Sequence, residues 1–435
     1  MFEITDDEEL KKRAIAHADA LLPYAGINYT HDMGFIFLPT VVQAYRHTGE
    51  EKYRAAGIQA ADMLARRFNQ KGKFLRAWGK LGSDDRAGWM IIDTMMNLEL
   101  LFWAMEVTGN KDYYNIAYRH AFTTMQESVR PDGSSYHVVE FNLDTGAVER
   151  KRTHQGYSDE STWARGQAWG IYGFANAYRR TGDERFLNVA QKMADYMIER
   201  LPDDFVPYWD LDLSGEDVLR DASAGAVAAS GLMLLAEVTH SKEDYEGYVA
   251  VGEKITQFLL RNYLFTESTR PKEEGLLLHT IYHYHNMWGV DESFQAGDYF
   301  FIEAVWKLWK RMELENLNQD VPIHKIYRFN DNWFYLEDDI DHMEGLHLAT
   351  QIWKTFTLPH TWSGFNAVDN VPRYQWDIGW YEKSFFVPVL KEDVKVLLAF
   401  EGVNISVTLY VNGKPEGCIS TIMIGSTSQI QETAI

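Results

Sequence analysis

The residues between 153 and 169 combine side chains that suit the binding of a carboxylated sugar. Indole rings cover the apolar face of a pyranose, amide and imidazole groups bond its hydroxyls, and a guanidinium can bind a carboxylate through two hydrogen bonds. Arg165 and Trp169 are four residues apart and would share one face of a helix. The alternative is a helix N-cap at Ser161 or Thr162 followed by ordinary core aromatics. We favour a binding site, because buried polar side chains need partners that an apolar core does not supply.

Two aspartates outside this segment are candidates for acid–base chemistry. Asp93 interrupts an apolar run that extends from Met90 to Met96. A buried carboxyl is rare unless it is paired or catalytic, and an apolar environment raises its pKa, so we expect Asp93 to be functional. Asp32 follows Thr30-His31, and by itself it would more often be a helix cap.

The composition of the chain limits its partners. Among 435 residues there are 63 Asp plus Glu and 42 Lys plus Arg, and the formal net charge of -21 disfavours nucleic acid and anionic membranes. An acidic sugar would therefore need a local cationic cluster, for which Arg165, Arg220 and the nearby histidines are candidates. The single Cys418 excludes an internal disulfide and a cysteine-rich metal site. Without a membrane-length apolar run or a secretory signal, the chain is expected to be cytoplasmic.

Residues 1–315 contain a recurring phrase, in which an apolar helix ends at Thr-Gly or a similar turn and a second amphipathic helix begins after an acidic pair. Its copies are residues 44–53, 104–113, 177–186 and 236–245. This self-similarity predicts a mainly α domain, a toroid of helical hairpins with function on the loops at one end. A partial copy at 4–10 has no helix before it, so we expect the first hairpin to be incomplete. Residues 316–435 change to short alternating runs that predict an incomplete β-sandwich.

Several motifs, in the same order along the chain, resemble the unsaturated glucuronyl hydrolases of glycoside hydrolase family eighty-eight over residues 1–315. They are residues 92–97, 155–169, 208–210, 220–224 and 297–299. The resemblance implies an (α/α)6 barrel, with Asp93 as general acid and base and Asp32 as the second active-site carboxylate. It also implies six sugar-binding positions, namely His137, His154, Gln155, Trp163, Arg165 and Trp169. The tail resembles, more weakly, the N-terminal jelly-roll of family two glycosidases.

The reaction implied by this resemblance is hydration of the C4=C5 double bond that polysaccharide lyases leave on a uronate. Asp93 would protonate C4, water would attack C5, and the resulting hemiketal would open and release the rest of an unsaturated uronate-terminated oligosaccharide. No cofactor or metal is expected. His279, His283 and His285 are better interpreted as part of an aromatic loop rim than as metal ligands, because no carboxylate lies at ligand spacing.

Three alternatives remain open at the level of the sequence. An unsaturated rhamnogalacturonyl hydrolase would keep the chemistry and change the substrate, although the ending Gln167-Ala168-Trp169 favours the glucuronyl family. A carbohydrate-binding protein with an inactive pocket would bind the unsaturated disaccharide without turnover. A sugar epimerase on a similar toroid would require no unsaturated substrate. The sequence does not distinguish the parent polysaccharide or the oligomeric state.

Overall fold

The computed structural model describes Thr5, residues 7–265 and 275–317, and seven strands between Trp333 and Ala434. The chain divides into two compact units, Met1–Ile326 and Tyr327–Ile435. The second unit contains antiparallel strand pairs in the orders β10-β8-β9, β11-β14 and β12-β13. These strands are β8 (Trp333–Glu337), β9 (Lys354–Phe356), β10 (Gly379–Glu382), β11 (Leu397–Phe400), β12 (Ser406–Val411), β13 (Lys414–Ser420) and β14 (Gln431–Ala434). A sandwich or jelly-roll arrangement of these pairs remains a prediction.

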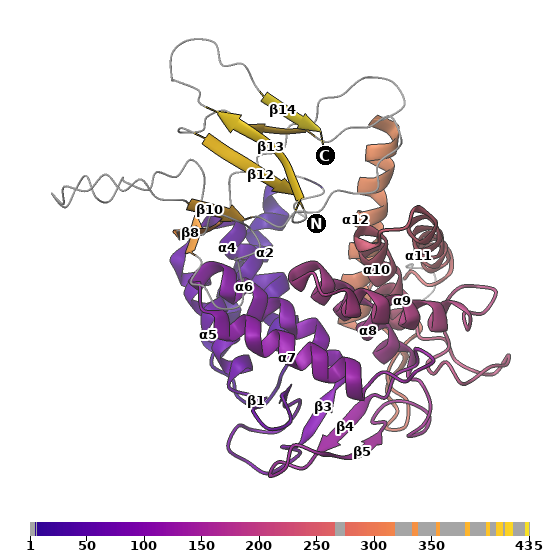
Figure 1. The fold of residues 1–435 in the computed structure, drawn as a ribbon. Coiled ribbons are helices and arrows are strands. Elements are labelled where there is room, and N and C mark those ends of the chain that lie inside the picture. Colours follow the sequence, from indigo (N-terminus) through magenta and orange to yellow (C-terminus); the bar gives the residue numbers. More distant parts are fainter. Residues whose placement is uncertain are drawn as a thin grey trace. The chain divides into compact units, whose positions relative to one another are not determined.

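The first unit consists mainly of helices, as the sequence predicted (Figure 1). Its α-helices are α2 (Glu8–Leu21), α3 (Met33–Phe37), α4 (Gln43–Thr48), α5 (Glu51–Ala65), α6 (Leu98–Thr108), α7 (Lys111–Glu127), α8 (Ala164–Thr181), α9 (Glu184–Ile198), α10 (Ala222–Val238), α11 (Lys242–Asn262) and α12 (Gln295–Leu317). Every residue of α10 except Glu237 is buried, whereas α7, α9 and α11 each bury only one face. Helices α8 and α10 therefore form inner walls, and the amphipathic helices cover them.

The recurring sequence phrase encodes the turn between an inner and an outer helix. In three of its copies a threonine hydroxyl donates to the carbonyl four residues earlier, and the following glycine ends the helix with a positive φ that L side chains rarely adopt. These pairs are Thr48 with Gly49 (φ 70°), Thr108 with Gly109 (φ 71°) and Thr181 with Gly182 (φ 67°). The next helix then begins at a capping residue, for example Asn110 before α7 and Asp183 before α9.

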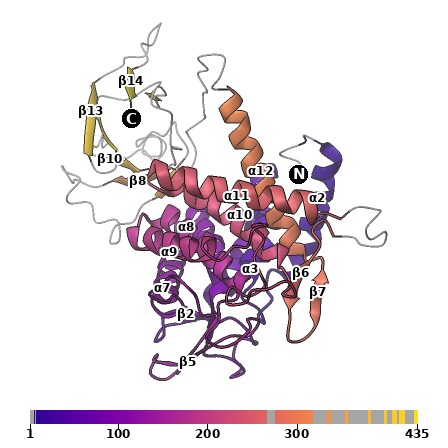
Figure 2. The same cartoon turned by 90° about the vertical axis from the view of Figure 1, so that its right-hand side faces the viewer.

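Short strands in the connections between helices supply the positions that carry the site. One antiparallel sheet has the order β3-β4-β5, from Trp89–Ile91, Val138–Phe141 and Val148–Arg152. These strands lie together below α7 in Figure 1. A separate hairpin pairs β6 (Thr280–His283) with β7 (Trp288–Glu292), and Figure 2 shows it beside the beginning of α12. Both groups of strands lie in the connections between helices. The sequence analysis predicted that the functional residues would lie on these connections.

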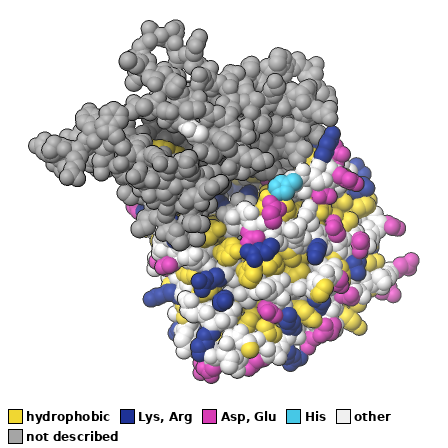
Figure 3. Space-filling view, in the orientation of Figure 1, with side chains coloured by type: hydrophobic (Ala, Val, Ile, Leu, Met, Phe, Trp, Pro, Cys, Tyr) yellow, Lys and Arg dark blue, Asp and Glu magenta, His cyan; other side chains and the backbone are white. Residues whose placement is uncertain are grey.

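The surface shows how the excess of acidic residues is distributed. On the visible face of the helical unit, acidic and basic side chains are interspersed with apolar ones (Figure 3).

In the described part of the chain, no helix combines the length and the apolar character needed to cross a membrane.

Candidate active site

Asp93 lies where β3 runs into the 3-10 helix η3 (Ile92–Asn97). Its side chain is only 15% exposed. Burial raises the pKa of this carboxyl to about 7, against an opposing effect of the Arg165 guanidinium and with a further contribution from the charge of Asp32. Among the described residues, Asp93 Oδ2 has no hydrogen-bond partner. The site therefore contains a carboxyl group that can hold or release a proton near neutral pH.

His137 faces this carboxyl from the residue before β4. Its Nδ1 accepts hydrogen bonds from the backbone N–H groups of His154 (3.3 Å) and Gln155 (3.2 Å). The proton of a neutral ring must therefore lie on Nε2, which is 3.6 Å from Asp93 Oδ2. Burial lowers the pKa of His137 well below its usual value, so the ring is neutral. Neither His137 Nε2 nor Asp93 Oδ2 has a hydrogen-bond partner among the described residues, so an unpaired donor and an unpaired acceptor face each other, a contact that the sequence did not suggest.

Asp32 lies at the beginning of α3, and its side chain is 41% exposed. It does not cap the helix through its side chain. Instead, Oδ2 accepts a hydrogen bond from Thr30 Oγ1 at 2.6 Å, and Oδ1 lies 3.3 Å from His31 Nε2. The carboxylate is therefore held by its own loop while part of it remains accessible.

The aromatic residues of the site form a continuous set of ring contacts. His137 stacks on Trp163 with ring centroids 4.4 Å apart, and His154 lies 4.9 Å from both Trp78 and His283. Trp169 instead meets Phe35 and Phe300 edge-on, and it is 3% exposed. Trp78 is a component that the sequence reasoning missed. The sequence around Trp78 does not indicate that its ring contacts His137 and His154, which come from distant loops.

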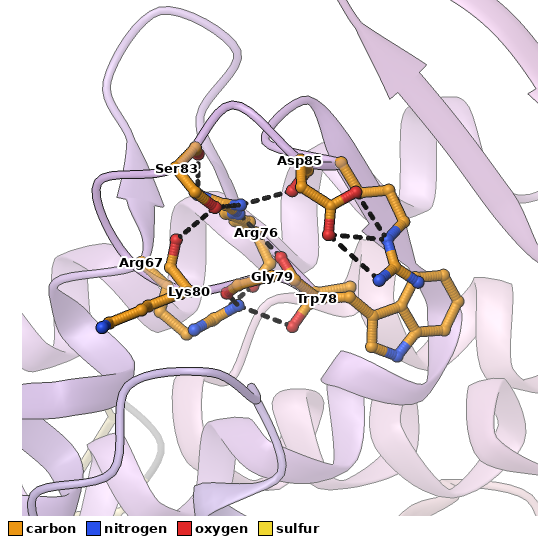
Figure 4. Close-up of polar contacts among 9 residues, drawn as sticks. Arg67, Arg76, Trp78, Gly79, Lys80, Ser83 and Asp85 are labelled. Atoms are coloured by element: carbon orange, nitrogen blue, oxygen red, sulfur yellow. Dashed lines mark hydrogen bonds and ion pairs between the residues drawn. The ribbon is translucent and has the colours of Figure 1, made fainter.

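Two buried arginines hold the loop that carries Trp78 (Figure 4). Arg67 donates to the backbone carbonyls of Arg76, Ala77 and Gly79 in this loop and to that of Asn28. Arg76 donates to the carbonyls of Trp78, Ser83 and Asp85. Because these contacts fix the backbone on both sides of the ring, the indole is positioned without a regular secondary-structure element around it.

Arg165 is placed differently from the carboxylate-binding fork that its sequence position suggested. It is 1% exposed, and Nη1 donates to Asp221 Oδ2 and to the carbonyl of Ile281, both at 2.5 Å. Nη2 donates to the carbonyl of Tyr282 at 2.8 Å. Both terminal nitrogens are therefore used within the protein, and Gln155 Nε2 donates to the same Tyr282 carbonyl. Arg220 is likewise paired, with Asp204 at 3.1 Å.

The remaining candidate residues occupy the rim or the supporting loops. His285 Nε2 lies 2.8 Å from the carbonyl oxygen of Gly156, and His279 pairs with Asp291. The alternative of an N-cap at Ser161 or Thr162 is wrong, because α8 begins after Trp163 and the Ser161 hydroxyl donates to Asp210.

Comparison with known proteins identifies the family of the chain. The family model described as Glycosyl Hydrolase Family 88 matches residues 1–200. The unsaturated chondroitin disaccharide hydrolase of Streptococcus agalactiae is 39% identical over 327 residues, which are 72% of this chain and 79% of that protein. An unsaturated glucuronyl hydrolase specific for heparin superposes with a TM-score of 0.67 at 33% identity, covering 72% of this chain and 83% of the other.

A third comparison includes a bound sugar. An unsaturated glucuronyl hydrolase from S. agalactiae, with one aspartate replaced by asparagine, was crystallised with dGlcA-GalNAc6S. It is 34% identical and superposes with a TM-score of 0.61 over 71% of this chain and 78% of that protein. The extent of these matches shows that the chain belongs to glycosyl hydrolase family 88 and that its helical unit is an (α/α)6 barrel.

Proposed function

We propose that the protein hydrolyses unsaturated uronyl oligosaccharides, the products of polysaccharide lyases, by hydrating the C4=C5 double bond of the terminal uronate. The observation that carries this proposal is the buried carboxyl of Asp93, with its pKa raised to about 7 and Oδ2 without a partner among the described residues. Relatives that act on unsaturated chondroitin disaccharides or on heparin, and one that binds dGlcA-GalNAc6S, support the substrate class.

In the proposed mechanism, protonated Asp93 donates its proton to C4, and positive charge develops at C5 and on the ring oxygen. Water adds to C5, Asp93 takes a proton from that water, and the hemiketal opens to release the leaving sugar. His137 presents Nε2 toward Asp93 at 3.6 Å, and Asp32 contributes a negative charge that also acts on Asp93. The spacing rule for retaining and inverting glycosidases does not apply, because C1 is not attacked.

Turnover can be followed as the loss of ultraviolet absorbance of the conjugated double bond. We would supply lyase products of chondroitin, hyaluronan and heparin, together with an unsaturated rhamnogalacturonan disaccharide. Cleavage of the glucuronyl substrates supports the proposal. Cleavage of only the last substrate would transfer the same chemistry to the rhamnogalacturonyl class, and a substrate-dependent increase in melting temperature without turnover would indicate binding alone.

Isotopes test the mechanism itself. Reaction in heavy water should place deuterium at C4 of the released uronate, and oxygen from labelled water should enter at C5. The bridging oxygen should leave with the other sugar and carry no label. Label at C1 would return the protein to conventional glycosidase chemistry and would contradict the role of Asp93.

A further inference from the structure

His31 is a buried imidazole that lies between the segments carrying the two carboxylates. It is 1% exposed, and it precedes Asp32 in the chain while Thr94 follows Asp93. Its Nδ1 is 2.9 Å from Thr94 Oγ1, and its Nε2 is 3.3 Å from Asp32 Oδ1. One side chain thus connects the immediate surroundings of Asp32 with those of Asp93.

Asn97 indicates which ring nitrogen carries the proton. Asn97 Oδ1 accepts the Phe35 N–H at 2.9 Å, so the amide nitrogen faces His31 Nδ1, at 3.5 Å. An amide nitrogen only donates, and therefore Nδ1 must present a lone pair, to which the Thr94 hydroxyl also donates. The ring proton then lies on Nε2, the nitrogen that is 3.3 Å from Asp32 Oδ1. Burial lowers the pKa of His31, which keeps this ring neutral.

The backbone around these groups leaves little room for adjustment. A Cβ atom at Gly34 would lie 2.5 Å from Asn97 Cα, so this turn of α3 packs directly on η3 and only glycine fits there. The second oxygen of Asp32 is held by Thr30 Oγ1 at 2.6 Å. One oxygen of Asp32 therefore has a hydrogen-bond donor, Thr30 Oγ1, and the other lies 3.3 Å from Nε2 of His31, whose ring Thr94 holds against the helix that carries Asp93.

We propose that His31, oriented by Thr94, is a positioning residue that fixes the carboxylate of Asp32 relative to Asp93 during hydration of the double bond. This inference rests on the proposed function. If the link is broken, Asp32 can rotate toward solvent, and its charge no longer helps to raise the pKa of Asp93. Other charged or titratable groups near these residues include Arg165, which acts on Asp93, and Arg67, which acts on His31. His120 and His137 also interact electrostatically with His31.

The test compares three variants in the full chain. Thr94→Val keeps the side-chain shape and removes the donor to His31, so kcat should fall by about 10- to 100-fold with KM changed by no more than about threefold. The basic limb of the kcat–pH profile should move to lower pH, because Asp93 loses its proton earlier. His31→Gln can present an amide donor near the position of Nε2 and should retain part of the wild-type activity, whereas His31→Asn should lose more of it.

Thr124→Val is the matched control. Thr124 is also buried, and its hydroxyl also contacts a buried histidine, His120, through Nε2 at 3.4 Å, but it adjoins neither carboxylate in the chain. This variant should keep the wild-type pH profile. If Thr94→Val keeps the wild-type kcat and basic limb, or if both threonine variants shift that limb equally, the positioning role is overturned. A wild-type protein without turnover on any unsaturated uronate would instead refute the proposed function itself.

Discussion

At the scale of single residues, the proposed chemistry depends on a carboxyl that is protonated when it meets the substrate. Asp93→Asn keeps the shape of this side chain and removes the transferable proton, so we expect turnover to fall by at least about 1,000-fold while substrate binding persists. Initial rates and calorimetric titration with an unsaturated disaccharide measure the two effects. The exposed Asp144→Asn is the control for the substitution. Activity within severalfold of the wild type would refute the assignment of Asp93.

The raised pKa of Asp93 also predicts a cost in stability. Unfolding returns the carboxyl to a pKa of about 4, so between pH 4 and pH 7 the folded protein binds more protons than the unfolded chain, and stability falls as the pH rises. A shift of about three pKa units corresponds to an upper bound of roughly 4 kcal/mol. Asp93→Asn should therefore be more stable than the wild type at pH 8, and the difference should shrink toward pH 4. Denaturant unfolding at both values measures this, and an equal difference at both would contradict it.

The sequence could identify the polar residues of the site more readily than their contacts. Asp93 was recognisable because a carboxyl within an apolar run requires a reason. The contribution of His31 was not recognisable, since it depends on a hydrogen bond to Thr94, 63 residues away. Arg165 shows the same limit: its type and position suggested a substrate ligand, and only the fold brings Asp221 and the hairpin carbonyls to its guanidinium.

At the scale of elements, Arg165 joins the first turn of α8 to the N-cap of α10 and to β6. Asp221 accepts the Ser223 N–H as that cap, and its carboxylate is completely buried. Arg165→Met should cost about 3–5 kcal/mol of unfolding free energy, because it leaves this charge without its cation. Arg165→Lys should lose less stability and still lose activity, since an ammonium cannot reach the same set of acceptors. Thermal unfolding and kcat measured on both variants test this, and a lysine variant with normal values of both would contradict it.

The helix-ending glycines allow a paired test of the repeat. Gly182 has a φ of 67°, whereas Gly247 lies inside α11, where an added Cβ atom would have open space with no contact within 4 Å. Gly182→Ala should destabilise the protein by about 1–2 kcal/mol, because alanine is strained at positive φ. Gly247→Ala should stabilise it by about 1 kcal/mol, because alanine is the better helix former. Denaturant midpoints measure both, and changes of the same sign would show that the two glycines do not differ as their conformations imply.

At the scale of the whole molecule, the fold was predictable because its signal is repeated. The inner and outer helices are distinguished by how much of their surface is apolar, and Thr-Gly turns mark three of the boundaries between them. The fourth copy has His240 in place of glycine, and there Thr239 ends α10 in an extended conformation instead. The connections are less regular, so the strands β3, β4 and β6, which deliver Asp93, His137 and Tyr282 to the site, could not be placed from periodicity.

The net charge of the whole chain leads to a prediction about substrate capture. A formal charge of -21 repels an anionic uronate, and the repulsion extends about 30 Å at 0.01 M salt but only about 8 Å at 0.15 M. Raising the salt over this range should therefore increase kcat/KM severalfold and leave kcat nearly unchanged, with a larger effect for a sulfated disaccharide than for an unsulfated one. Stopped-flow or initial-rate measurements at constant pH would show this. A decrease in kcat/KM would mean that local cations, such as Arg86 beside Trp78, dominate the field that the substrate meets.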